Sequence, residues 1–151
     1  MRPIARTSAW WDIFMNKGSG DNRIYFGIWG TSPPAGYYRG SLTDENSVSR
    51  GIPDELPGAQ INLNTWTHLA FVLDRSIERF NLYRDGNYVG GVALGTFGSV
   101  SPEENLYFAS KPGEPFKGFV DEVRIYARAL TAAEIQKHYV EGLESHQYAR
   151  K

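Results

Sequence analysis

Few side chains in this sequence are spaced so that they could carry chemistry, and His68 is the first of them. It shares one strand face with Trp66 in the run 65–74, where a histidine could act as a ligand or a general base. No serine or cysteine nucleophile motif lies near it, so we interpret it as a structural histidine with a hydrogen-bond partner. His138 and His146 lack a metal-type partner at helical spacing.

Asp121 is the most informative carboxylate. In the predicted strand 116–127, alternation places it on an apolar face with Val123 and Ile125, while Glu122 faces the other way. A carboxylate on such a face needs a partner, because burying it alone is costly or forces protonation. Backbone amides, a cation such as arginine, or a hard metal would serve. We favour an aspartate that ties down a neighbouring loop over a metal ligand.

The remaining carboxylate pairs argue against glycoside hydrolysis. Glu103-Glu104 and Asp121-Glu122 are adjacent in sequence, and adjacent side chains in a strand point to opposite faces. Retaining hydrolysis requires two carboxyl groups about 5 Å apart on one face. The chain also has no cysteine, which excludes disulfides, thiolate metal sites and cysteine nucleophiles.

Aromatic side chains are the candidates for ligand contact, since sugar rings have apolar faces that stack on flat aromatics. They surround a stretch rich in glycine and proline, 30–58, which is predicted to form long loops. We expect about half of the set to be core, because Trp10 and Trp11 are consecutive and must face opposite ways. The candidate ligand-binding residues are Trp11, Trp29, Tyr37 and Tyr38.

Charge and hydropathy exclude two classes of partner. The 16 basic and 17 acidic side chains give a net charge of -1, and no basic stripe suited to nucleic acid is visible. Apolar stretches are only a few residues long, far short of the roughly 20 that span a bilayer. The length predicts a single domain over 1–151, with a polar tail at 144–151.

The elements that must position these residues are mostly short strands separated by turn residues. Asp85-Gly86 between two β runs predicts a two-residue hairpin, because both turn positions need positive φ. Both faces of the run 65–74 are apolar, which predicts a central strand. The strands are predicted at 10–15, 23–29, 37–42, 65–74, 79–84, 87–94, 105–109 and 116–127.

The end of the chain changes period. Thr131 and Glu134 form a capping box, and an apolar residue recurs every four positions from Ile135. This predicts a short helix at 131–141. The fold class is therefore all-β, an antiparallel β-sandwich or jelly roll with one short C-terminal α-helix.

Three spans together resemble the laminin G-like jelly-roll domains of the concanavalin A-like lectin/glucanase superfamily. Asn64–Phe71 is similar to that family's W-x-H-V/L-A strand, and Leu82–Gly86 to its lYvDG hairpin. Phe116–Tyr126, leading into Ala129–Ile135, matches the ending f-x-G-x-iDEvriY…aLsxxEI. Residues 8–30 fit the earlier strands more loosely.

The resemblance implies further expectations. We expect the family's opening strand or strands to be missing before Trp10, so that either the sheet is completed differently or one sheet edge is open. An open edge could pair with another chain, which makes a homo-oligomer a hypothesis. Many members carry a structural calcium near the strand of Asp121, which makes calcium a candidate cofactor. The glucanases share a Glu-x-Asp-x-x-Glu strand that this sequence lacks, so we do not expect an enzyme.

The function that the resemblance implies is non-catalytic recognition of a glycan, or of a glycosylated or extracellular protein, at an extracellular or cell-surface location. The alternative from another class is a structural or assembly domain. Such a domain would self-associate or dock to a partner through its sheet without binding sugar.

Overall fold

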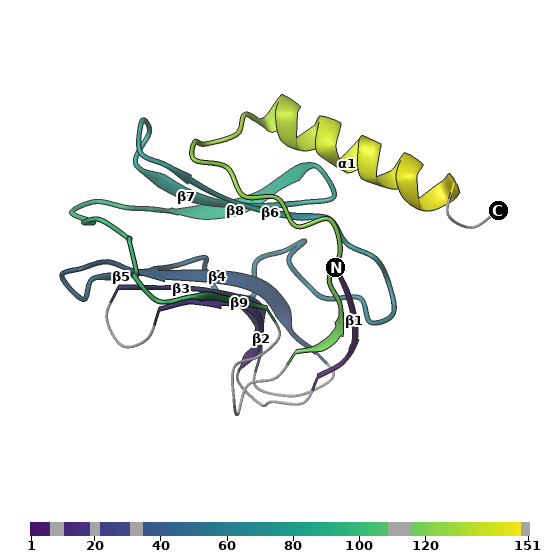
Figure 1. The fold of residues 1–151 in the computed structure, drawn as a ribbon, viewed down its shortest axis with the longest axis horizontal. Helices are drawn as coiled ribbons and strands as arrows, with labels where there is room; N and C mark the ends of the chain where they lie inside the picture. Colours follow the sequence, from purple (N-terminus) through teal and green to yellow (C-terminus); the bar gives the residue numbers. More distant parts are fainter. Residues whose placement is uncertain (7–10, 19–21, 31–34, 109–115, 149–151) are drawn as a thin grey trace.

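The chain folds as two facing antiparallel sheets with a helix laid across one of them (Figure 1). The computed structural model describes residues 1–6, 11–18, 22–30, 35–108 and 116–148, with side chains as far as Ser145. The predicted class, an antiparallel jelly-roll sandwich with a C-terminal helix, is confirmed.

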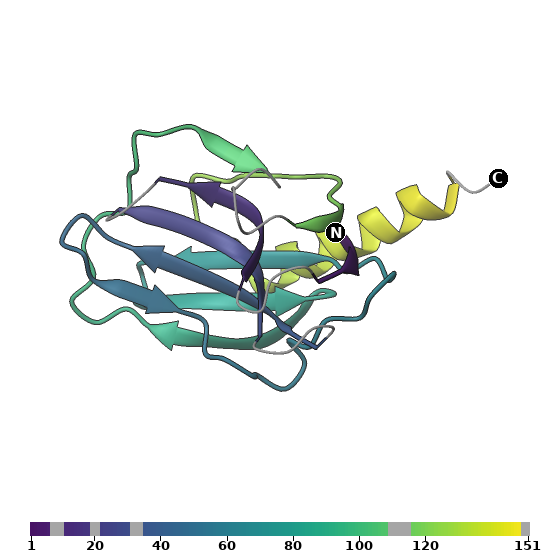
Figure 2. The same ribbon diagram turned by 90° about the horizontal axis from the view of Figure 1, so that it is seen from below.

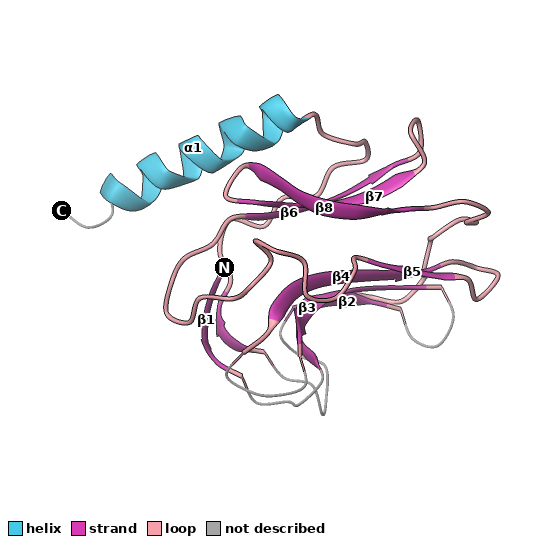
Figure 3. Cartoon of the chain, turned by 180° about the vertical axis from the view of Figure 1, so that it is seen from behind, coloured by secondary structure: helices cyan, strands magenta, loops and turns pink. Residues whose placement is uncertain are grey.

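The larger sheet has the order β5-β4-β3-β2-β9 and the smaller one the order β6-β7-β8. Figure 3 shows the two sheets lying one above the other. The larger sheet contains β2 (Trp11–Lys17), β3 (Arg23–Trp29), β4 (Tyr37–Thr43), β5 (Ser49–Gly51) and β9 (Leu106–Phe108). The smaller sheet contains β6 (Leu69–Asp74), β7 (Arg79–Arg84) and β8 (Asn87–Ala93). A separate pair joins β1 (Arg2–Ala5) to β10 (Lys117–Phe119).

Stacked phenylalanines join the two sheets at the centre of the core. The ring centroids of Phe26 in the larger sheet and Phe71 in the smaller one lie 4.2 Å apart, and the two rings are 4° from parallel. Phe80 stacks beside Phe71. Gly40 of β4 lies against this stack. A Cβ at Gly40 would come within 2.7 Å of Phe80 and 2.8 Å of Phe71, so glycine is needed for the close approach.

A buried ion pair closes one end of the sandwich. Arg6 Nε lies 2.8 Å from Asp12 Oδ2, and neither side chain is exposed to solvent. The same guanidinium donates to the carbonyls of Gly30 (3.1 Å) and Ala35 (2.5 Å). One cation thus satisfies a buried carboxylate and two loop carbonyls, as a buried charge requires.

The predicted hairpin is confirmed. β7 and β8 are joined by Asp85 and Gly86, whose φ angles are 49° and 77°. The predicted capping box is also present, since Glu134 N donates to Thr131 Oγ1 (3.3 Å) and Thr131 N donates to Glu134 Oε2 (2.8 Å).

Helix α1 (Ala132–Tyr148) is longer than predicted and includes most of the stretch expected to be a polar tail. The helix continues through Gly142, a residue type that often ends a helix, and no proline interrupts residues 132–148. Its apolar stripe is buried at one end only: Ile135 is fully buried, whereas Leu143 is 45% exposed.

The strand predicted over 116–127 ends at Phe119, and this correction moves Asp121 out of any strand. The bonding changes at this point: Phe119 is the last residue opposite β1, Glu122 takes a left-handed φ of 49°, and its amide bonds to Asp121 Oδ1 at 2.8 Å. Such local side-chain bonds compete with strand ladders.

The prediction that 65–74 is a central strand was also wrong, because β6 has only β7 as a named neighbour in the described chain.

Replacing Gly40 by alanine should destabilise the fold by about 1–3 kcal/mol, because the new methyl group overpacks the phenylalanine stack. Denaturant unfolding measures the change. Gly142→Ala is the matched control, because a Cβ there meets only Glu122 Oε2 at 3.7 Å and alanine favours the helix by roughly 0.5–1 kcal/mol. Equal effects of the two substitutions would contradict the packing argument.

Candidate functional site

Three aromatic residues and one amide form a row across the outer face of the larger sheet, the face turned toward the viewer in Figure 2. Trp11 of β2 lies opposite Trp29 of β3, and Trp29 lies opposite Tyr37 of β4. Tyr37 in turn bridges to Gln60. Residues directly opposite one another in a ladder share a face, so these four side chains, here called the aromatic row, are neighbours.

Arg39 packs the two tryptophans together. The Trp11 and Trp29 rings lie 5.2 Å apart at 59°, and the Arg39 guanidinium carbon lies 5.5 Å and 5.1 Å from their centroids. Asp54 Oδ1 holds Arg39 Nη1 at 2.5 Å. A charged donor and a carboxylate therefore border the row beside flat aromatic surface.

Gly27 allows the Trp11 ring to pack directly against the backbone of β3. It sits on β3 opposite Arg39, and a Cβ there would fall 3.1 Å from Trp11 Cε3 and 2.8 Å from the carbonyl of Asp12. Glycine inside a strand often marks such a close approach. This was the one sequence signal that could have placed Trp11 next to Arg39.

A hollow of about 200 Å³ adjoins the Tyr37 end of the row. Gln60 Nε2 donates to Tyr37 Oη at 3.5 Å, which places the amide and the phenol together at its edge. The lining residues are Ala35, Gly36, Tyr37, Gln60 and Ile61. The row therefore ends at a small concave surface that carries polar groups.

The structure separates the predicted aromatic set. Trp11, Trp29 and Tyr37 are brought together on the outer face, whereas Tyr38 is a core residue, 1% exposed, whose hydroxyl donates to Thr67 Oγ1 at 3.2 Å. Alternation along β4 is the reason, since Tyr37 and Tyr38 must face opposite ways. Tyr38 cannot stack on a ligand from this position. Trp10 lies outside the described residues.

Asp121 is exposed rather than buried, and it accepts a hydrogen bond from the amide of Glu122. Among the residues that the structure describes, no three His, Cys, Asp or Glu side chains gather as a metal-binding group.

The loop-fastening carboxylate that was expected at Asp121 is found instead at Asp44, which sequence reasoning missed. Asp44 is fully buried after β4. Its Oδ1 accepts from the amides of Asn46 (2.9 Å) and Val48 (2.8 Å), and its Oδ2 from that of Gly98 (2.5 Å). Burial raises the pKa of this carboxyl, but these amides together with the charge of Arg50 outweigh it, so the pKa lies below its ordinary value.

The histidines occupy structural positions. His68 lies under α1, with its ring 5.9 Å from that of Tyr139 and its buried Nδ1 without a hydrogen-bond partner. Burial lowers its pKa. His138 contacts Tyr126 Oη (2.9 Å) and Arg124 Nη1 (2.8 Å). The side chain of His146 lies outside the described residues.

Comparison with known proteins identifies the family. A model described as the concanavalin A-like lectin/glucanases superfamily, of the laminin G type, matches residues 1–136. The chain belongs to this superfamily. No curated protein matches the laminin G-like domain.

One solved structure similar to the laminin G-like domain is an S-layer domain-containing protein of Clostridium thermocellum, residues 221–444, with 19% sequence identity and a TM-score of 0.38. The match covers 87% of this chain and 64% of that one, so the chain spans less than two thirds of the S-layer protein fragment. In the described part of the laminin G-like domain, no helix is long and apolar enough to cross a bilayer.

Asp44→Asn should lower the Tm of the laminin G-like domain at neutral pH, because an amide cannot accept all three backbone hydrogen bonds. The folded-state pKa of Asp44 is lowered, so its stabilisation is present above the unfolded-state value near 3.8 and is lost as pH falls through the folded-state value. The Tm difference between the two proteins should therefore narrow in strong acid. Thermal unfolding between pH 2 and 7 measures this, with the exposed Glu144→Gln as control.

A calcium site at Asp121 remains a prediction of the sequence. If it exists, calcium should raise the Tm above that in chelator, and Asp121→Asn should abolish the increase. An identical Tm in calcium and in chelator would remove Asp121 from the list of metal ligands.

Proposed function

We propose that this laminin G-like domain is a non-catalytic carbohydrate-binding module whose ligand lies along the aromatic row. The observation that carries the proposal is the alignment of Trp11, Trp29 and Tyr37 across three neighbouring strands on one face. The apolar faces of sugar rings stack on aromatic rings of this kind, and adjacent polar groups take the hydroxyls.

The dimensions of the row support an oligosaccharide rather than a single sugar. Neighbouring strands lie about 4.8 Å apart, so the three steps from Trp11 to Gln60 span roughly 14 Å. Hydrogen-bonding groups border the row along this length: the Arg39–Asp54 pair beside the tryptophans and the Gln60 amide beside Tyr37. An extended chain of a few sugar rings matches a surface of this length and polarity.

Two observations favour binding without catalysis. The laminin G-like family is generally non-catalytic. At the described row the bordering carboxylate is Asp54, which is paired with Arg39, whereas glycoside hydrolysis uses two carboxyl groups that flank the scissile bond. Membership of this family also supports an extracellular or cell-surface location, where glycans and glycosylated proteins would be the partners.

The test begins with a thermal-shift screen against polysaccharides and oligosaccharides, followed by calorimetry on the sugars that raise the Tm. Ligand at 100 times its Kd adds about 2.7 kcal/mol to the free energy of unfolding. Trp29→Ala and Tyr37→Ala should each weaken binding at least about tenfold, because aromatic anchors at the centre of an interface contribute more than about 1.4 kcal/mol.

Tyr88→Ala is the matched control. Tyr88 is 54% exposed on β8 of the other sheet and packs beside Tyr83, so its removal should leave sugar affinity unchanged. Gln60→Ala tests the polar end of the row without removing an aromatic ring, in case the tryptophan variant loses stability. Affinities that are equal in wild type, Trp29→Ala and Tyr37→Ala would refute the proposed site.

A further inference from the structure

A second line of side chains crosses the larger sheet, parallel to the aromatic row. Asn16 of β2 lies opposite Tyr107 of β9 on one side and opposite Tyr25 of β3 on the other. Tyr25 in turn lies opposite Ser41 of β4. Residues directly opposite one another in a ladder share a face of the sheet. These four residues are here called the tyrosine row.

Alternation along the strands places the tyrosine row on the outer face, which is turned toward the viewer in Figure 2. Met15 packs against the core and Phe26 belongs to the phenylalanine stack, so the residues next to them, Asn16 and Tyr25, point the other way. Along β3, Tyr25 precedes Trp29 by four residues. At about 3.3 Å per residue, the two rows are therefore roughly 13 Å apart on one surface.

Asn16 holds an unpartnered acceptor at the centre of the tyrosine row. The residue is only 9% exposed, and its Oδ1 is buried without a hydrogen-bond partner in the described part of the chain. A buried acceptor that is left unpaired lowers the free energy of unfolding, and asparagine is also disfavoured in strands. Asn16 therefore reduces the stability of the free protein, and a donor supplied by a ligand would remove this cost.

The neighbours of Asn16 match the surface of a sugar. Tyr107 is 46% exposed, and the Arg23 guanidinium carbon lies 5.3 Å from the centroid of the Tyr25 ring. Because β9 and β3 lie on the two sides of β2, the backbones that carry the two tyrosines are about 9.6 Å apart, twice the strand spacing. Aromatic surface contacts the apolar faces of sugar rings, and the guanidinium donors and the amide acceptor take the hydroxyls.

A ligand reaches Oδ1 only when a side chain beside it turns aside, because the atom is covered in this structure. Tyr107 can do so, since β9 is a three-residue strand at the edge of the larger sheet, with β2 as its only named neighbour in the described chain. Exposed side chains change rotamer within nanoseconds. Rotation of Tyr107 is therefore part of binding at this position.

We propose that the tyrosine row is a second sugar-binding position, in which a hydroxyl of the ligand donates to Asn16 Oδ1 between Tyr25 and Tyr107. That the ligand is a sugar rests on the proposed function, whereas the position itself rests on the unpartnered Oδ1. A polysaccharide that reaches both rows at once binds more tightly than either row alone would allow, because the second contact is made within one complex.

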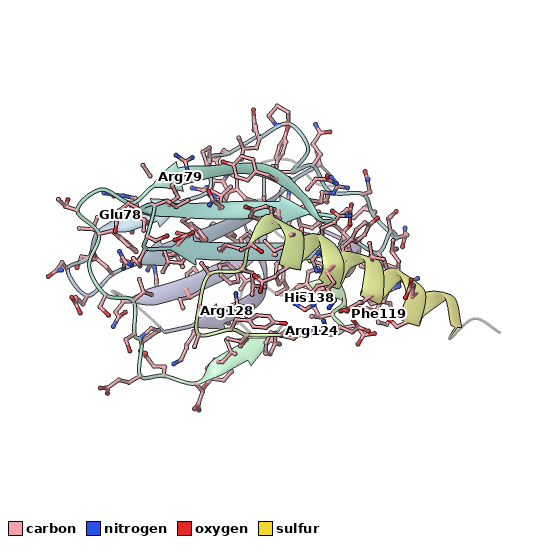
Figure 4. All side chains as sticks on the ribbon, turned by 90° about the horizontal axis from the view of Figure 1, so that it is seen from above. Glu78, Arg79, Phe119, Arg124, Arg128 and His138 are labelled. Atoms are coloured by element: carbon pink, nitrogen blue, oxygen red, sulfur yellow. The ribbon has the colours of Figure 1, made fainter. Side chains whose placement is uncertain are left out.

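Asn16→Leu tests the unpartnered acceptor without any ligand. Leucine has a similar shape and no polar atom, so the Tm of the free protein should rise by at least about 2 °C. Asn81→Leu is the matched control. Asn81 is 6% exposed in β7, but its Oδ1 accepts from Arg79 Nε at 3.4 Å, so its replacement should lower the Tm. Figure 4 shows Arg79 on the smaller sheet, away from the tyrosine row.

Binding is followed position by position by nuclear magnetic resonance on the full chain. The probes are four neutral hexasaccharides: cellohexaose, xylohexaose, mannohexaose and chitohexaose. At least one of them should shift the ring resonances of Tyr25 and Tyr107 to saturation. Asn16→Leu should abolish these shifts while the Trp29 indole still responds. Tyr107→Ala should weaken binding at the tyrosine row at least about tenfold, whereas Tyr88→Ala should leave it unchanged.

The outcomes distinguish this position from the aromatic row. Shifts at Trp29 that occur without shifts at Tyr25 and Tyr107 overturn the second position and leave the proposed function standing. Shifts at Tyr25 and Tyr107 without a response of Trp29 support the second position and contradict the aromatic row. The proposal is also overturned if no hexasaccharide shifts Tyr25 or Tyr107, or if the Tm of Asn16→Leu is at or below that of the wild type.

Discussion

The contact on which the rest of the molecule depends is the stack of Phe26, Phe71 and Phe80 over Gly40. No residue with a side chain fits at position 40 without moving a ring, so β4 can pair in only one register. A slip of one residue would exchange the faces of the whole strand. The packing that keeps Tyr38 inside therefore also holds Tyr37 and Arg39 outside, and the aromatic row is a consequence of core packing.

Local sequence signals predicted the elements whose structure is decided locally. The Asp85-Gly86 turn and the Thr131–Glu134 capping box depend on residues a few positions apart, and both are present. The short strands β1 and β5 were missed because their partners, not their residues, make them strands. The opposite error occurred after Phe119, where the residues favour a strand. Among the described residues, this run has no backbone partner, so no strand forms.

The candidate site shows a similar division. Alternation predicts that Tyr37 and Tyr38 face opposite ways, but only the tertiary register decides which of them enters the core. Asp44 was missed because its partners include Gly98, 54 positions away. Asp121 is exposed rather than buried because the strand that was predicted to carry it ends at Phe119. Alternation along a strand therefore tells which side chains share a face of the sheet. It does not tell which residues of other elements pack against them.

Arg6 has a consequence for how such a domain can diversify. Its guanidinium holds Asp12 and the carbonyls of Gly30 and Ala35, which are the two ends of the connection between β3 and β4. Because both ends are fixed by a residue outside the connection, the intervening residues can change in number or type at little cost to the sandwich. The aromatic row borders this connection, so evolution can vary the rim of the surface while the frame beneath it stays constant.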